Sequence, residues 1–288
     1  AASDVYKRQL LETPIVYSRY MDDPDLKLLL VLLLVAAAVG AGWYFRDEIL
    51  PEPEESIVMP PESAADGEST AEVPRHPVSA YEPVQTEPAQ LVPLPPLDDS
   101  DGYFLLALVD AFGKGIEPLL VKDALIDKFV ATVDNLPREH VAEKIRPAGR
   151  LTQAFRVEAT GGNGPIYLDP ENYQRYDPLV GQVASADIDV LVDTYRRFYP
   201  LLQQSYERLG YPNGYFNDRV IEVIDHLLAT PEGDEPIRLV RPHVLYEFAD
   251  PGLEALSSGQ KLLLRMGSEH AAVVKRILGE LREQLAHQ

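Results

Sequence analysis

The 288-residue chain contains no cysteine. This absence excludes a thiol nucleophile, and with it every mechanism that proceeds through a cysteine thiolate. It does not assign the protein to a compartment, because a domain without thiols suits oxidising and reducing surroundings equally well.

Basic residues are also scarce. The chain has 26 Lys and Arg residues against 46 Asp and Glu residues, which gives a formal net charge of −20 at pH 7. A protein that binds nucleic acid or lies on anionic lipid needs a basic surface. The charge balance therefore argues against nucleic acid as a partner and against a domain that lies flat on anionic lipid.

Long apolar runs are almost absent, and the exception is one uncharged run at residues 28–45. A helix of that length spans about 27 Å, close to the ~30 Å hydrocarbon core of a bilayer. The run ends in Trp43, Tyr44 and Phe45, as is typical where a helix leaves the membrane. The pattern predicts a transmembrane helix at residues 26–46. A cleaved signal peptide is the alternative, but it needs a shorter apolar stretch and a small-residue cleavage site.

The flanks of this run bear on its orientation. Residues 1–25 form an N-terminal tail, of which residues 1–9 resemble translated sequencing-adapter sequence and are left out of the fold argument. Arg19 and Lys27 precede the run and Arg46 follows it, which mildly favours a cytoplasmic N-terminus. We therefore expect a single-pass membrane protein whose C-terminal domain lies outside the cytoplasm, which in a Gram-negative cell means an inner-membrane anchor and a periplasmic domain.

Residues 47–96 have the composition of a disordered linker. They contain 11 prolines and 11 acidic residues, and their single base is Arg75. High proline content, low hydrophobicity and strong net charge make a packed core implausible. A flexible chain of this length spans ~40 Å on average, so the linker is expected to act as a long tether.

Residues 97–288 are numerous enough for one well-packed domain. A helix is predicted at residues 103–112, where Gly113 ends it. Pro118 suits the first position of a second helix, whose apolar stripe extends to Val133.

The next segment changes its pattern. Residues 155–158 alternate in polarity, residues 161–164 supply a glycine-rich turn, and residues 166–168 return as a second strand. This predicts a β-hairpin. Residues 237–248 contain Pro242 and are expected to form a short edge strand or an extended arm.

Three further helices are predicted from apolar positions that recur every 3.6 residues, at residues 187–209, 217–229 and 268–285. Pro200 is expected to kink or break the first of them near Phe198. The inward-facing positions of the last helix are Val274, Ile277, Leu278, Leu281 and Leu285. The predicted fold class is mainly α with a small β-hairpin.

Several strings resemble a known bacterial family, the one catalogued as domain of unknown function 3014. They are Leu94–Asp101, Phe129–Pro137, Gly210–Arg219, Arg238–Pro242 and Gly259–Gly267. The resemblance covers nearly all of residues 94–285 and includes the layout of anchor and linker. It implies a single-pass envelope protein with no assigned activity, so it provides no catalytic residues to carry across.

One string matches a nucleophile motif. Ser258 and Lys261 have the S-x-x-K spacing of penicillin-binding proteins, but the S-x-N and K-T-G elements that complete such a site are missing. Ser257 and Gln260 instead have the spacing of a helix capping box. The structural interpretation is therefore favoured.

Acidic residues and a histidine share one face of the predicted helix at residues 217–229. Asp218, Glu222 and His226 could converge on a metal ion or act as acid and base, which would make the protein an envelope hydrolase. A polar stripe opposite an apolar stripe is, however, what any amphipathic surface helix shows. No metal or other cofactor is expected, and catalysis by these residues is kept as the alternative.

The connection before that helix is the stronger candidate for function. Aromatic and polar side chains gather there between two amphipathic helices, and connections carry function more often than helices do. The candidate partner-binding residues are Tyr211, Tyr215, Phe216, Asn217 and Arg219. A buried aromatic corner is the competing interpretation. The favoured function is an interaction or adaptor module that is held to the membrane through residues 28–45 and binds another envelope protein. Its oligomeric state is not predicted.

Overall fold

The structure, a computed structural model, describes residues 73–79, 93–147, 154–159, 164–184, 188–243 and 245–286. The predicted anchor at residues 28–45 lies outside this part of the chain, and so does most of the predicted linker. Within the described ranges, no helix is both long and apolar enough to cross a membrane.

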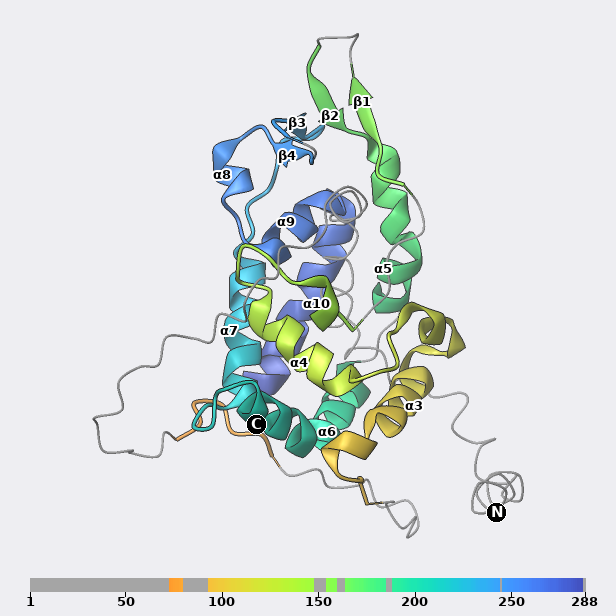
Figure 1. The fold of residues 1–288 in the computed structure, drawn as a ribbon, viewed down its shortest axis with the longest axis vertical. Helices are drawn as coiled ribbons and strands as arrows, with labels where there is room; N and C mark the ends of the chain where they lie inside the picture. Colours follow the sequence, from red (N-terminus) through yellow and green to blue (C-terminus); the bar gives the residue numbers. More distant parts are fainter. Residues whose placement is uncertain are drawn as a thin grey trace.

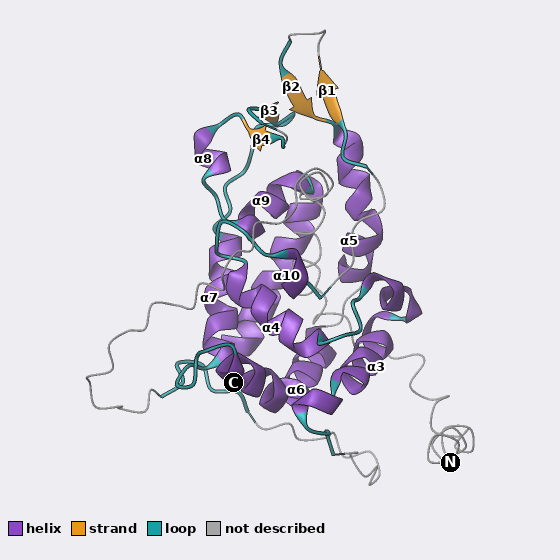
Figure 2. Ribbon diagram, in the orientation of Figure 1, coloured by secondary structure: helices purple, strands orange, loops and turns teal. Residues whose placement is uncertain are grey.

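The domain is mainly helical, with a small antiparallel sheet at one end (Figures 1 and 2). The helices are α3 (Asp101–Phe112), α4 (Leu125–Asn135), α5 (Asp177–Ala184), α6 (Ile188–Arg208), α7 (Phe216–Leu228), α8 (Pro251–Glu254), α9 (Ser258–Arg265) and α10 (Ser268–Ala286). Short 3₁₀ helices are η2 (Leu97–Asp99), η3 (Lys114–Leu119), η4 (Glu143–Ile145) and η5 (Pro170–Tyr176). The mainly helical class predicted from the sequence is confirmed.

Helix α10 lies at the centre of the packing, where it contacts α5, α6, α7 and α9. Its buried residues are Val274, Ile277, Leu278, Leu281 and Leu285. These are the positions that the 3.6-residue period predicts, so the stripe is confirmed. A helix with one continuous apolar stripe is stabilised mainly by burying that stripe, and α10 does so against several partners at once.

One prediction about proline is wrong, and of the kink or break expected at the other proline the break is excluded. Pro118 lies inside η3 instead of starting a long helix, and α4 begins only at Leu125. The chain between them is not helical: Leu120 is extended, Val121 N–H donates to the carbonyl of Pro147 at 2.8 Å, and Ala124 has a left-handed backbone. Helix α6 is a single element that continues through Pro200. Its apolar face stays buried on both sides of the proline, and this packing offsets the backbone hydrogen bond that a proline removes.

The predicted hairpin is present, but it belongs to a larger sheet than the sequence predicts. Strands β1 (Val157–Ala159), β2 (Ile166–Leu168), β3 (Arg238–Val240) and β4 (Glu247–Phe248) pair in that order, all antiparallel. Residues 237–248, expected to form one short edge strand or an extended arm, instead form two strands, of which β3 lies inside the sheet and β4 lies at its edge. A second apolar cluster packs here, made of Leu168, Ile237, Leu239, Phe248 and Leu264.

A chain of aromatic rings ties α3, α4, α6 and α7 together at the opposite end. The ring of Phe104 lies 5.1 Å from that of Phe198 and 6.2 Å from that of Phe129. Phe129 in turn meets Phe216 edge-on at 6.1 Å, and Phe216 lies 5.5 Å from Tyr206. Such tilted pairs add to the burial of the rings themselves. They fix where α7 begins relative to α6.

We predict that Gly259→Ala destabilises the fold. A Cβ atom at this position would lie 2.6 Å from Cδ2 of Leu227 and 3.2 Å from the carbonyl oxygen of Leu136. Overpacking of this kind costs about 1–3 kcal/mol, which chemical denaturation would measure. The matched control is Gly279→Ala within α10, where a Cβ atom meets nothing within 4 Å. It should stabilise the helix by about 0.5–1 kcal/mol. Equal stabilities for the two variants would contradict this close approach.

Candidate functional site

The connection between α6 and α7 is held from α6 by one side chain. The Gln203 side-chain oxygen accepts the backbone N–H of Phe216 at 2.8 Å, and its Nε2 donates to the carbonyl of Gly214 at 2.8 Å. The first N–H groups of a helix have no partner within the helix. Gln203 supplies an acceptor for one of these N–H groups, a role that a capping residue directly before α7 usually has.

The candidate partner-binding residues divide into buried and accessible ones. The side chain of Phe216 is fully buried in the aromatic chain, and Asn217 is fully buried beside it. Tyr211 stacks on Tyr206 with their ring centroids 4.6 Å apart. Tyr215 and Arg219 are partly exposed. The connection is thus an aromatic corner on its inner side and presents polar groups on its outer side.

Arg219 is held by a carboxylate that the sequence reasoning did not single out. Its Nε donates to Oδ1 of Asp134 at 2.9 Å, and its Nη2 donates to the Asp134 backbone carbonyl at 2.7 Å. The Asp134 side chain is only 3% exposed. The hydroxyl of Tyr211 and Nη2 of Arg138 also reach its Oδ2, at 3.3 and 2.8 Å. A carboxylate within an otherwise apolar helix stripe is the only sequence signal that could have identified it.

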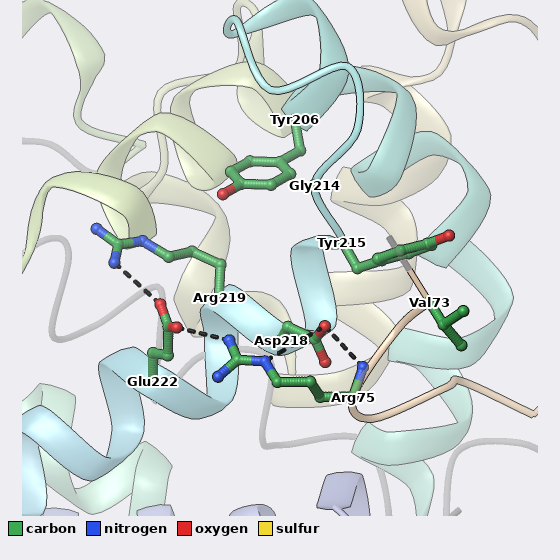
Figure 3. A pocket seen from close by; sticks show the side chains of 8 residues that line it. All are labelled: Val73, Arg75, Tyr206, Gly214, Tyr215, Asp218, Arg219 and Glu222. Carbon is green, nitrogen blue, oxygen red and sulfur yellow. Dashed lines mark hydrogen bonds and ion pairs between the residues drawn. The ribbon is translucent and has the colours of Figure 1, made fainter. Parts of the chain in front are cut away.

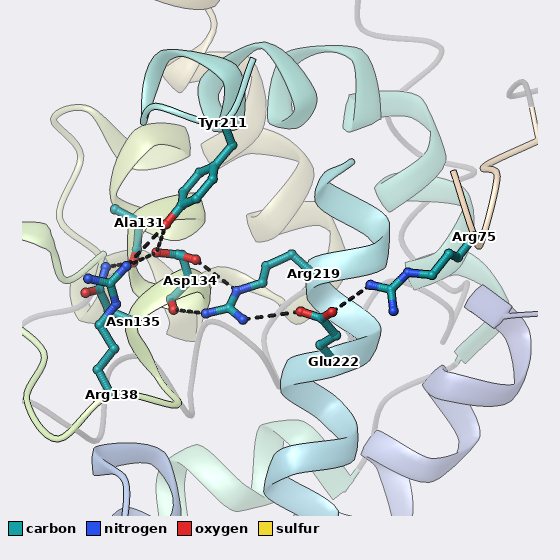
Figure 4. Close-up of polar contacts among 8 residues, drawn as sticks. All are labelled: Arg75, Ala131, Asp134, Asn135, Arg138, Tyr211, Arg219 and Glu222. Carbon is teal, nitrogen blue, oxygen red and sulfur yellow. Dashed lines mark hydrogen bonds and ion pairs between the residues drawn. The ribbon is translucent and has the colours of Figure 1, made fainter. Parts of the chain in front are cut away.

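From Asp134 a line of alternating charges runs to the surface (Figure 4). Arg219 donates to Glu222 at 3.3 Å, and the other oxygen of Glu222 accepts from Arg75 at 2.6 Å. Partial burial would raise the pKa of Glu222, but hydrogen bonds from Arg75 and Arg219 outweigh it and hold that pKa below its ordinary value. Burial likewise opposes the charge of Arg219, yet Asp134 and Glu222 raise its pKa above the usual value.

Arg75 belongs to residues 73–79, which lie within the predicted linker and are bound on the surface of the domain. Both oxygens of Asp218 accept backbone N–H groups from this segment, Oδ2 from Arg75 at 2.9 Å and Oδ1 from His76 at 2.7 Å. Asn217 donates from Nδ2 to the carbonyl of His76 at 2.9 Å. Two neighbouring side chains of α7 therefore bind both donors and acceptors of a backbone that bends at Arg75 and His76.

A cleft of about 510 Å³ opens between this segment and the α6–α7 connection (Figure 3). Its lining is Val73, Arg75, Tyr206, Gly214, Tyr215, Asp218, Arg219 and Glu222. Carboxylates, guanidinium groups and aromatic rings thus meet at one surface. This combination is suited to binding a peptide, because rings supply contact area and charges supply orientation.

The three residues of the catalytic alternative do not converge. Asp218 and Glu222 bind residues 73–79, whereas Nε2 of His226 lies 2.8 Å from Oγ of Ser257. Partial burial and the nearby charge of Arg219 lower the pKa of His226. In the part of the chain that the structure describes, no three His, Asp or Glu side chains are grouped as metal ligands.

The S-x-x-K string is occupied by structural contacts. Ser257 and Gln260 form the capping box of α9, as the sequence predicts. Ser258 donates to the carbonyl of Leu136 at 3.2 Å, and Nζ of Lys261 donates to Oε1 of Glu254 at 2.9 Å. A nucleophilic serine needs a base within hydrogen-bond reach, and Lys261 is directed to Glu254 instead.

Comparison with known proteins gives one match. A family described as "Protein of unknown function (DUF3014)" matches residues 125–282, which is more than half of the chain. This range contains α4, the α6–α7 connection, α7 and most of α10. No curated protein and no solved structure matches the chain.

We predict that Arg219→Leu lowers the free energy of unfolding substantially. Removal of one partner from a buried ion pair costs about 3–5 kcal/mol, and the lower end applies here because Arg138 still pairs with Asp134. Urea denaturation of the variant and the parent measures the difference. The control is Arg276→Leu, which removes an exposed pair with Glu280 on α10. Such pairs contribute about 0–1 kcal/mol. A similar loss in both variants would show that the buried pair is not special.

We also predict a pH-dependent contribution from Glu222. Its folded-state pKa is depressed below 4.5, so the ionised form stabilises the docked arrangement at neutral pH. This contribution is lost as the pH falls through that depressed pKa. At pH 7 the free energy of unfolding of the parent should therefore exceed that of Glu222→Gln by about 0.5–1 kcal/mol. The difference is small because the Glu222 side chain is nearly half exposed.

Thermal unfolding of both proteins at neutral and acidic pH tests this. The two stabilities should converge below the pKa of Glu222. Arg75→Gln is the matched variant, because it removes one of the two donors and should shrink the difference without abolishing it. A difference in stability between the parent and Glu222→Gln that persists at low pH would show that the effect comes from packing and not from charge.

Proposed function

This chain belongs to the DUF3014 family, for which no function is known, and we propose that it is a membrane-tethered interaction module of the bacterial envelope. Residues 28–45 would anchor it in the inner membrane, and the helical domain would bind a short segment of another envelope protein. The observation that supports this is the pair Asn217 and Asp218, which hold the backbone of residues 75 and 76.

Backbone contacts of this kind are how peptide-binding domains gain affinity without a fixed sequence, and pockets for side chains then give specificity. The surface between Tyr215 and Glu222 offers both. Asp218 and Asn217 contact the main chain, while Glu222 pairs with a basic side chain. A short segment covers a small area, so the interaction belongs with weak and transient ones.

The tether complements a weak contact. A domain held by residues 47–72, the part of the predicted linker that precedes the docked segment, would stay within a few tens of ångströms of the membrane, at ~6 Å × √n for a flexible chain. Tethering raises the local concentration of both partners to roughly millimolar. A weak peptide site is then sufficient for binding at the membrane, although it would be ineffective in dilute solution.

The test is photocrosslinking in cells with a photoreactive residue at Tyr215. We expect one discrete adduct with an envelope protein, because Tyr215 lines the cleft. The control places the same probe at Leu106, which is 55% exposed on α3 and remote from the cleft. An identical adduct from both positions would indicate non-specific contact. A folded, well-expressed protein that yields no adduct from Tyr215 would contradict the proposal.

A further inference from the structure

The segment of residues 73–79 has the features of a ligand. Its sequence is Val-Pro-Arg-His-Pro-Val-Ser, and it contains the single base of residues 47–96. Partly buried Pro74, His76 and Val78 alternate with exposed positions along it. The alternation shows that one side of the segment lies on the surface, and the backbone bends at Arg75 and His76.

The two prolines suit this role. Proline has no N–H and a fixed φ angle, so Pro74 and Pro77 restrict the backbone on either side of the bend while they donate nothing. Between them, the donors are the N–H groups of Arg75 and His76, and Asp218 accepts both. A chain that is restricted before it binds loses less entropy on docking.

The side chains add charge and apolar contact. Arg75 donates to Glu222, which lies on the domain that holds most of the protein's acidic residues. Val78 packs against the main core, and Nδ1 of His76 lies 3.4 Å from the carbonyl of Ala286 at the end of α10. The segment thus crosses from the start of α7 to the end of α10.

We propose that residues 73–79 occupy, within the same molecule, a groove whose ligand class is a peptide that has an arginine between two prolines and bends at this arginine and the residue after it. The groove is defined by Asn217, Asp218, Glu222 and the end of α10. This inference rests on the proposed function and names its partner's chemistry: a segment of the form Pro-Arg-x-Pro, in which x has a free N–H. A partner segment of this class displaces residues 73–79 and takes over the same hydrogen bonds.

The experiment uses the full chain in detergent and a fluorescent peptide of residues 72–80. In one variant, residues 73–79 are replaced by seven Gly and Ser residues, which empties the groove. The matched control replaces residues 60–66 in the same way. Fluorescence anisotropy is expected to show saturable binding to the emptied variant and at least ~10-fold weaker binding to the parent and the control, because the internal segment competes at roughly millimolar effective concentration.

A peptide with His76→Pro removes one of the two N–H donors and should bind at least ~10-fold more weakly to the emptied variant, the loss of a hydrogen bond to a charged group. The full chain with His76→Pro is a milder alternative to the replacement, and it should bind the unmodified peptide better than the parent does. Equal binding to parent, control and emptied variant would overturn the inference, as would equal affinities of the two peptides.

The outcome separates this inference from the proposed function. If the peptide fails to bind the emptied variant while Tyr215 still yields a discrete adduct, the ligand class is wrong and the adaptor proposal stands. If the peptide binds as expected but no adduct forms in cells, the groove is a site for its own segment and the adaptor proposal is overturned.

Discussion

The carboxylate of Asp134 lies almost wholly out of water, and the arrangement around it depends on the positive charge that compensates it. An unpaired charge at this depth would cost several kcal/mol. Arg219 meets it with two hydrogen bonds, one of them to the backbone of the same residue. The pair therefore joins α4 to α7 at a fixed distance. It also sets where the outer end of Arg219 lies, and hence the position of Glu222 on the surface. The groove is thus coupled to the core by ion pairs as well as by packing.

The helices could be predicted from the sequence because their signals are local. The apolar periods of α6, α7 and α10 persist for many residues, and Gly210 and Gly113 end two helices where a left-handed or otherwise unusual backbone is needed. Of the sheet, only the hairpin of β1 and β2 could be predicted. The pairing of β2 with β3 joins Ile166 to Leu239, across a segment that contains η5, α5, α6 and α7. Such pairing depends on how those helices pack, and no local pattern in either strand encodes it.

The candidate site shows the same division. The sequence indicates the α6–α7 connection, because aromatic and charged residues are concentrated there, but it does not separate buried members from accessible ones. Phe216 and Asn217 directly follow the accessible Tyr215 in the sequence, and only the direction of α7 decides which of these side chains enter the core. The docked segment could not be predicted, since its partners lie more than 140 residues away. Its one visible signal is a lone base between two prolines in an acidic stretch.

The energetics of this docking favour exchange over permanent closure. Each N–H that donates to the Asp218 carboxylate contributes about 1.5–3 kcal/mol, whereas the largely exposed pair of Arg75 and Glu222 contributes about 0–1 kcal/mol. Ordering the backbone costs about 1–2 kcal/mol for each residue that is fixed, and proline reduces this cost only at its own position and the one before it. These opposing contributions are similar in size, so the segment is held weakly enough for a competitor to replace it. When it is bound, residues 47–72 connect the domain to the anchor proposed at residues 28–45, and release lengthens this connection to residue 93, because Leu94 packs against the main core. Ligand exchange at the groove would therefore also change how far from the membrane the domain can act.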